Sequence, residues 1–282
     1  MRKLSSTSAL VLLWAQQECY QSKKARDYLS RLDLEDGKIF YERCMEIWPH
    51  YDEVIKNRKF GVLTLIKKCC AEKINGQQLI IAGAGFDALG IEVTEHYPHV
   101  KVFEIDNENI DIKSCLVAKL GNESKGIAFI KVNLFDSSDV HRSLSAHGWD
   151  PAMPTLLILE GISYYLPTEL IQKLVQVINP EWTIFEFLKQ YKEIATDRVN
   201  IPKKVFGLIS SLCELSHISQ YNYSQLEELA DNISISAKYS MKRLEKMRTG
   251  SNRFFPTEDS GWIEVCLLAN RKRTEREKPL RF

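Results

Sequence analysis

Two glycines and an aspartate follow the short apolar run 78–82, and this spacing is typical of a ligand-binding turn. Gly83 and Gly85 would let the backbone approach a ligand at the edge where open α/β sheets bind theirs. The same glycines also satisfy the G-x-G-x-x-G/A pattern of dinucleotide sites, and a tight turn without a ligand is the structural alternative. Asp87, near the start of the next helix, would repel a pyrophosphate but not a sulfonium amino acid. We therefore predict S-adenosylmethionine as the cofactor, rather than NAD.

Polar side chains at the ends of the next two expected strands extend this candidate site. Glu104 and Asp106 lie about 20 residues beyond the glycines, where a carboxylate can accept hydrogen bonds from both ribose hydroxyls. They point to the same side of a strand by its period of two, so both are candidates. Asn133 follows the third strand and would contact adenine through its amide, with Leu134 against the face of the base. Ordinary surface acids and a loop-capping asparagine are the alternatives.

These residues are positioned by an alternation of strand and helix patterns that begins at residue 77. Before it, helical spacing dominates residues 5 to about 75, as in Leu10, Leu13 and Trp14. We predict an α/β fold with an open, mostly parallel sheet of about seven strands. A helical cap would cover residues 1–76, and the main domain would span 77–282 with a helical lid insertion at about 190–230. The expected strands are 78–82, 100–105, 127–134, 155–159, 182–187, 233–239 and 262–269.

Three ordered segments resemble motifs of the leucine carboxyl methyltransferase family. Residues 79–88, LIIAGAGFDA, resemble its GAGxDT segment; residues 102–106, VFEID, resemble FEVD; residues 159–167, LEGISYYLP, resemble EGxxxYLP. Thr7-Ser8-Ala9-Leu10 is similar to the start of the family's first helix, so the resemblance runs from about residue 5 to 187. It implies the Rossmann-like fold of class I methyltransferases with a helical cap, and S-adenosylmethionine as the cofactor.

The resemblance also implies roles for residues outside the glycine turn. In the family, a basic residue some 25 positions before the glycines holds a carboxylate of the cofactor or acceptor, and here it falls on Arg58. The planar guanidinium suits bidentate carboxylate binding. Glu160 matches the family's glutamate beside the methionine portion of the cofactor. Tyr164 and Tyr165 would project over the reaction centre as catalytic residues, or belong to the core.

Three positions depart from the family's pattern. The family usually has aspartate where this chain has Asn133, serine or threonine where it has Lys59, and threonine where it has Ala88. These departures leave the cofactor prediction in place. They leave open which acceptor is methylated, and even whether the reaction is a simple methyl transfer.

Methyl transfer from a sulfonium requires alignment and exclusion of water more than it requires a base. A carboxylate acceptor is already ionised at neutral pH, since its usual pKa is near ~4. The sequence therefore predicts an S-adenosylmethionine-dependent methyltransferase that O-methylates a carboxylate on a small molecule or peptide. One alternative is a cyclase of the azetidine-2-carboxylate synthase type, in which the cofactor's own amino group expels methylthioadenosine. A non-catalytic cofactor-binding protein is another.

Composition bounds the partners and the compartment. Lys and Arg number 38 against 37 for Asp and Glu, so overall charge favours neither nucleic acid nor an anionic membrane surface. Seven cysteines without a C-x-x-C pair are typical of a reduced compartment, and we expect a cytoplasmic protein. The apolar run 9–15 is too short to span a membrane and predicts a packed first helix. No metal site is expected, because His96 and His99 straddle a predicted helix end without a third ligand.

Overall fold

The computed structural model describes residues 6–15, 17–71, 76–120, 126–215 and 217–274, with a seven-stranded sheet at its centre. The strand order is β3-β2-β1-β4-β5-β7-β6; β1 to β5 are parallel, and β7 runs antiparallel to both β5 and β6. This confirms the predicted open, mostly parallel α/β fold. The strands are β1 Gln78–Ala82, β2 Lys101–Asp106, β3 Ile127–Lys131, β4 Thr155–Leu159, β5 Trp182–Leu188, β6 Ile233–Ser240 and β7 Ile263–Asn270.

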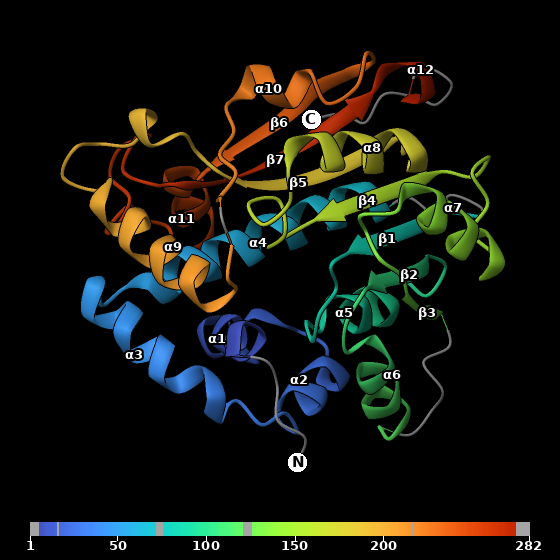
Figure 1. Cartoon of the computed structure of the whole chain (residues 1–282), viewed down its shortest axis with the longest axis horizontal. Coiled ribbons are helices and arrows are strands. Elements are labelled where there is room, and N and C mark those ends of the chain that lie inside the picture. The colour runs from blue at the N-terminus through green and yellow to red at the C-terminus, as the bar shows by residue number, and fades with distance from the viewer. Residues whose placement is uncertain (1–5, 16, 72–75, 121–125, 216, 275–282) are drawn as a thin grey trace.

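Helices lie on both faces of the sheet and at one end of it (Figure 1). They are α1 Ser6–Ala15, α2 Lys23–Leu29, α3 Lys38–Ile47, α4 Tyr51–Cys70, α5 Leu89–His96, α6 Ile110–Ala118, α7 Ser137–Ala146, α8 Thr168–Ile178, α9 Asn200–Leu212, α10 Tyr223–Glu227, α11 Met241–Thr249 and α12 Arg271–Thr274. Short 3-10 turns add η1 Gln17–Cys19, η2 Glu35–Gly37 and η3 Tyr191–Glu193. Residues 1–5 and 72–75 of the expected cap, and 275–282 of the main domain, lie outside the described residues.

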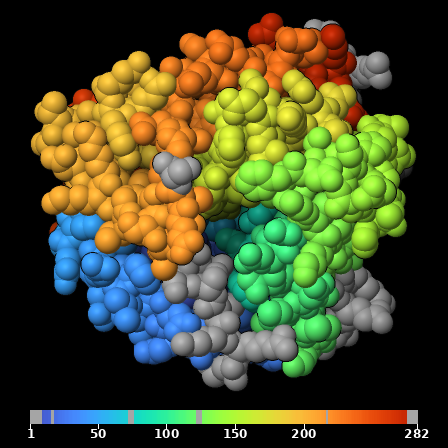
Figure 2. Space-filling model, viewed as in Figure 1, coloured from blue at the N-terminus to red at the C-terminus, as the bar shows by residue number. Residues whose placement is uncertain are grey.

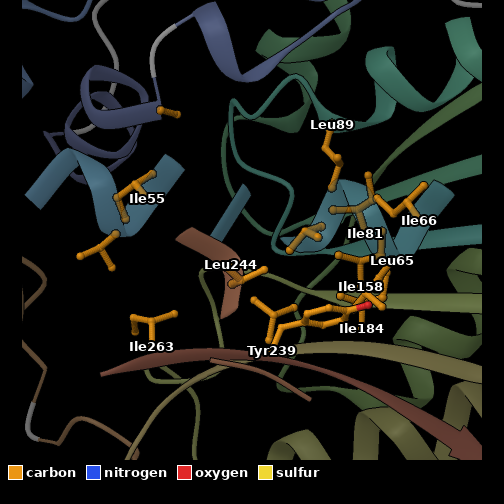
Figure 3. Packing of buried hydrophobic residues seen from close by; sticks show 14 of the residues in the cluster. Ile55, Leu65, Ile66, Ile81, Leu89, Ile158, Ile184, Tyr239, Leu244 and Ile263 are labelled. Carbon is orange, nitrogen blue, oxygen red and sulfur yellow. The ribbon is translucent and has the colours of Figure 1, made fainter. Parts of the chain in front are cut away.

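The central strands are buried on both faces, which explains why their sequences are continuous apolar runs. In β1 every residue is buried, and alternate side chains enter two different cores. Leu79 and Ile81 face the core that contains α4, whereas Ile80 faces the core that contains α7 and α8. Figure 3 shows Leu65 and Ile66 of α4 beside Ile81 and other strand residues. This packing fixes α4 across the sheet.

The first three helices and α9 gather at one end of the sheet (Figure 1). Helix α1 contacts α3, α4 and α9, while α2 packs against α5. Within the described part of the chain, no helix combines the length and apolarity that a membrane crossing requires. Because of these helix contacts, α1 and α4 lie beside the ends of the parallel strands.

A close backbone contact fixes η2 against α1. A Cβ atom added at Gly37 would lie 2.6 Å from Leu10 N and 2.8 Å from Ala9 Cβ. The φ angle of Gly37 is −82°, so the glycine is required for space and not for conformation. The close approach of α1 to η2 therefore requires a residue without a side chain at position 37.

We expect Gly37→Ala to lower the free energy of unfolding by about 1–3 kcal/mol, because overpacking forces the two segments apart. Gly207→Ala is the control, since nothing lies within 4 Å of a Cβ at that exposed position in α9. There alanine should raise the free energy of unfolding by up to about 1 kcal/mol. Urea denaturation followed by circular dichroism measures both. Equal effects of the two changes would contradict the packing argument.

Candidate active site

A cleft opens where the loops after β1 and β4 meet helices α1 and α4. Figure 2 shows a hollow in this face of the molecule, bounded by the orange segment that contains α9 and by green segments. The residues that line the cleft come from four separate stretches of sequence: Val11, Leu12, Arg58, Gly83, Ala84, Gly85, Phe86, Asp87, Glu160, Gly161 and Tyr165. The structure thus brings Arg58, Gly83, Gly85, Asp87, Glu160 and Tyr165 together, as the sequence predicted.

The glycine turn is held against the end of β2. Gly83 and Gly85 both have positive φ angles, of 67° and 47°, a conformation that favours glycine. The amides of Gly83 and Ala84 donate to the carbonyl of Ile105 at 2.9 and 3.3 Å, and the amide of Gly85 donates to Asp106 Oδ2 at 2.8 Å. The half-buried carboxylate of Asp106 therefore lies directly at the turn.

The other acid predicted to bind ribose lies elsewhere. Glu104 is fully buried and pairs with Lys113 Nζ at 2.6 Å. A Cβ atom on Gly90 would collide with its carboxylate, so the group packs closely against α5. Glu104 therefore has no exposed oxygen in this structure, and its contact with a ribose hydroxyl stays a prediction. Of the two acids, the half-buried Asp106 is the one that a ligand at the turn could reach directly.

Asp87 accepts hydrogen bonds from three parts of the chain. Its Oδ1 accepts from Tyr20 OH at 2.7 Å and from the amide of Leu89 at 2.8 Å, and its Oδ2 accepts from Lys59 Nζ at 2.7 Å. Burial opposes ionisation, but the Lys59 ammonium outweighs it and holds the pKa of Asp87 below its usual value. Tyr20 was not predicted as a site residue, because nothing in its sequence neighbourhood signals this contact.

Two adjacent cations of α4 meet the acids of the cleft. Lys59 is fully buried, and its Nζ also lies 2.8 Å from Glu160 Oε2, so it bridges Asp87 and Glu160. Arg58 Nε lies 3.3 Å from Glu160 Oε1, and Arg58 Nη1 donates to Tyr164 OH at 3.3 Å. Burial works against the charge of Lys59, but the two acids raise its pKa. The sequence singled out Lys59 only as a departure from the family's pattern.

A further acid, Glu186 of β5, lies behind these cations. It is fully buried; its Oε2 accepts from the amide of Gly161 at 2.6 Å, and its Oε1 has no hydrogen-bond partner among the described residues. Burial raises the pKa of Glu186 to about 7, although the nearby Arg58 opposes the shift. A glutamate inside the apolar run 182–188 was the available sequence signal.

The two tyrosines take different positions. Their ring centroids are 4.7 Å apart in an edge-to-face contact, and Tyr164 also packs edge-on against Phe206 of α9 at 4.9 Å. Tyr164 is buried and contacts Arg58, whereas Tyr165 lines the cleft. Burial raises the pKa of both phenols, so both are protonated at neutral pH.

Asn133 and Leu134 lie beyond the end of β3. Asn133 is exposed, and its Oδ1 accepts from the amide of Phe135 at 3.0 Å, whereas Leu134 is buried in the core that contains α7 and α8. Neither is among the residues that line the cleft around the glycine turn. Their contact with adenine stays a prediction.

The fold is that of class I methyltransferases. Two solved structures share the fold: a protein from Thermobifida fusca YX classed as a methyltransferase (TM-score 0.63, 13% identity, 84% of this chain and 89% of that one) and a DUF574 family protein from Streptomyces avermitilis MA-4680 (TM-score 0.66, 11% identity, 93% and 97%). At these identities the likeness establishes the fold alone.

The family follows from the sequence comparison. Residues 20–179, more than half of the chain, match the leucine carboxyl methyltransferase family, and the protein belongs to that family. A Mycolicibacterium gilvum (strain PYR-GCK) protein, whose name assigns it to the S-adenosyl-L-methionine-dependent methyltransferases, is 34% identical over 106 residues. That match spans 36% of this chain and 33% of the relative. Family membership identifies S-adenosylmethionine as the cofactor.

The buried Glu186 gives stability a measurable pH dependence. The folded protein retains the proton of Glu186 up to a pH of about 7, whereas the unfolded chain releases it near 4.5. The contribution of Glu186 to the free energy of unfolding is therefore fully present below pH 4.5. It declines as the pH rises toward 7, by on the order of 1–3 kcal/mol.

We expect Glu186→Gln to remove this decline. Urea denaturation of both proteins between pH 4.5 and 8 gives the two profiles, and groups common to both cancel in their difference. The stability of the wild type relative to the variant should fall with pH. A difference that stays constant, or rises, would show that Glu186 is ionised in the folded protein.

Proposed function

We propose that the protein is an S-adenosylmethionine-dependent methyltransferase that transfers the methyl group to a carboxylate oxygen of a small-molecule or peptide acceptor. One observation carries the proposal: Arg58 and Glu160 are buried side by side at the cleft, with Arg58 Nε 3.3 Å from Glu160 Oε1, and neither atom makes a hydrogen bond in the described structure. The amino-acid portion of the cofactor has the complementary groups. Its carboxylate fits the guanidinium, and its ammonium fits the glutamate.

The remaining predicted contacts fit the same orientation of the ligand. The open backbone of Gly83 and Gly85 leaves room for the ligand beside the turn. Asp106 accepts one hydrogen bond on each carboxylate oxygen, from the amides of Gly85 and Glu108. Each oxygen can accept one more, from a ribose hydroxyl. Asn133 and Leu134 would then meet the adenine. We place the protein in the cytoplasm, since all seven cysteines are free thiols.

The chain's own contribution to the reaction is alignment and exclusion of water. When bound, the cofactor would supply an electrophilic methyl group to the acceptor oxygen, with S-adenosylhomocysteine as the leaving group. An acceptor carboxylate needs no base, which suits a cleft whose tyrosines are protonated. Tyr165 lines the cleft and would donate to the second acceptor oxygen, while Tyr164 holds Arg58 in place. The helical cap and the segment 190–230 would shape the acceptor pocket.

Incubation of the purified protein with S-adenosylmethionine and pooled carboxylic acids and peptides tests the proposal. We expect S-adenosylhomocysteine to form only when an acceptor is present, together with a base-labile methyl ester, both measured by mass spectrometry. Methylthioadenosine formed without an acceptor would contradict methyl transfer and indicate the cyclase reaction, which the comparisons do not support.

Two isosteric changes on β2 serve as a matched pair in this assay. Asp106→Asn should lower kcat/KM for the cofactor about tenfold or more, because it removes a charged acceptor. Glu104→Gln should leave kcat/KM within a few-fold when measured on folded protein, since that carboxylate is buried against Lys113. A larger loss with Glu104→Gln would contradict the assignment of the two acids.

A further inference from the structure

Lys59 occupies a site that has the chemistry of an ammonium-binding pocket. Its Nζ lies 2.7 Å from Asp87 Oδ2, 2.8 Å from Glu160 Oε2 and 5.6 Å from the centroid of the Tyr20 ring. Two carboxylates and an aromatic face are the groups that bind ammonium ligands. Since the Lys59 side chain is fully buried, the chain itself fills this pocket with a cation.

A ligand ammonium finds few free acceptors beside this lysine. Both oxygens of Asp87 already accept hydrogen bonds, from Tyr20, Leu89 and Lys59, and Glu160 Oε2 accepts from Lys59. Glu160 Oε1 is left. An incoming ammonium must therefore share Glu160 with the Lys59 ammonium, and two like charges close together in a buried site repel each other.

We infer that Lys59 is a specificity residue, which weakens the preference of the cleft for nucleosides that carry an α-amino acid tail over nucleosides that lack one. This inference rests on the proposed function, because it takes the cofactor to bind with its tail at Arg58 and Glu160. S-Adenosylhomocysteine carries the ammonium and the carboxylate. 5′-Methylthioadenosine shares the thioether and the adenosine but has neither charge, so it does not compete with Lys59.

Removing the lysine charge should tighten binding of the tail alone. In Lys59→Thr, Asp87 and Glu160 lose the ammonium that lies between them, while Arg58 stays beside Glu160, and the ligand ammonium takes the place of Lys59 Nζ. We expect the ratio of the dissociation constants of 5′-methylthioadenosine and S-adenosylhomocysteine to rise about tenfold, equivalent to ~1.4 kcal/mol. The affinity for 5′-methylthioadenosine itself should change less than about twofold.

Calorimetric titration of both ligands into the wild type and the variants measures this ratio. Lys59→Gln is the second variant, in case threonine disrupts the fold. Glutamine removes the charge but keeps a long side chain with a hydrogen-bond donor. Lys56→Thr is the matched control: it makes the same change one turn earlier on α4, where the lysine pairs with Asp52 at 2.8 Å and Glu53 at 3.7 Å. Its ratio should equal that of the wild type.

A ratio that stays constant or falls in both Lys59 variants would overturn the inference, since it would mean that the lysine does not oppose, or even helps to hold, the tail. S-Adenosylhomocysteine should also raise the melting temperature of the Lys59 variants at least as much as that of the wild type. A smaller rise in the variants would overturn the inference as well. Methyl transfer is not part of this experiment. A protein that shows the expected ratios but transfers no methyl group would overturn the proposed function and leave the role of Lys59 intact.

Discussion

The cleft depends on one buried ionic contact, in which the Lys59 ammonium lies between the carboxylates of Asp87 and Glu160. Burying charges is costly unless each is paired and hydrogen-bonded, and removing one partner leaves the others uncompensated. The contact joins α4 to the loops after β1 and β4, which are far apart in the sequence. It thereby fixes the glycine turn, Glu160 and the neighbouring Arg58 relative to one another.

Around this contact the structure separates groups that support the cleft from groups that are open to a ligand. Asp87 and Lys59 have their hydrogen-bonding partners within the chain, whereas Glu160 Oε1 and Arg58 Nε make no hydrogen bond among the described residues and lie 3.3 Å apart as an ion pair. The fold ties the first set to the scaffold and presents the second to the amino-acid tail of a cofactor. A hydrogen-bonded scaffold beside charged groups that make no hydrogen bond is the arrangement expected of a preorganised binding site.

The sequence predicted the parts of this site that depend on local pattern. Apolar runs, the glycine turn and strand-end acids revealed the sheet, Gly83 and Asp106, and the family motifs located Arg58 and Glu160. Lys59, Tyr20 and Glu186 were missed because their contacts depend on how α4, the segment before α2 and β5 pack in space. The burial of Glu104 against Lys113 was not predicted, because the period of a strand gives the face of a side chain but not how far the covering helices reach.

A crystal structure of the protein with S-adenosylhomocysteine would test the central claim most directly. The account predicts that the ligand carboxylate meets Arg58, its ammonium meets Glu160 Oε1 and its ribose hydroxyls meet Asp106, while Asp87 keeps its contact with Tyr20. A nucleoside bound away from the glycine turn would contradict the account, as would a tail that points out of the cleft and leaves Arg58 and Glu160 without a ligand contact.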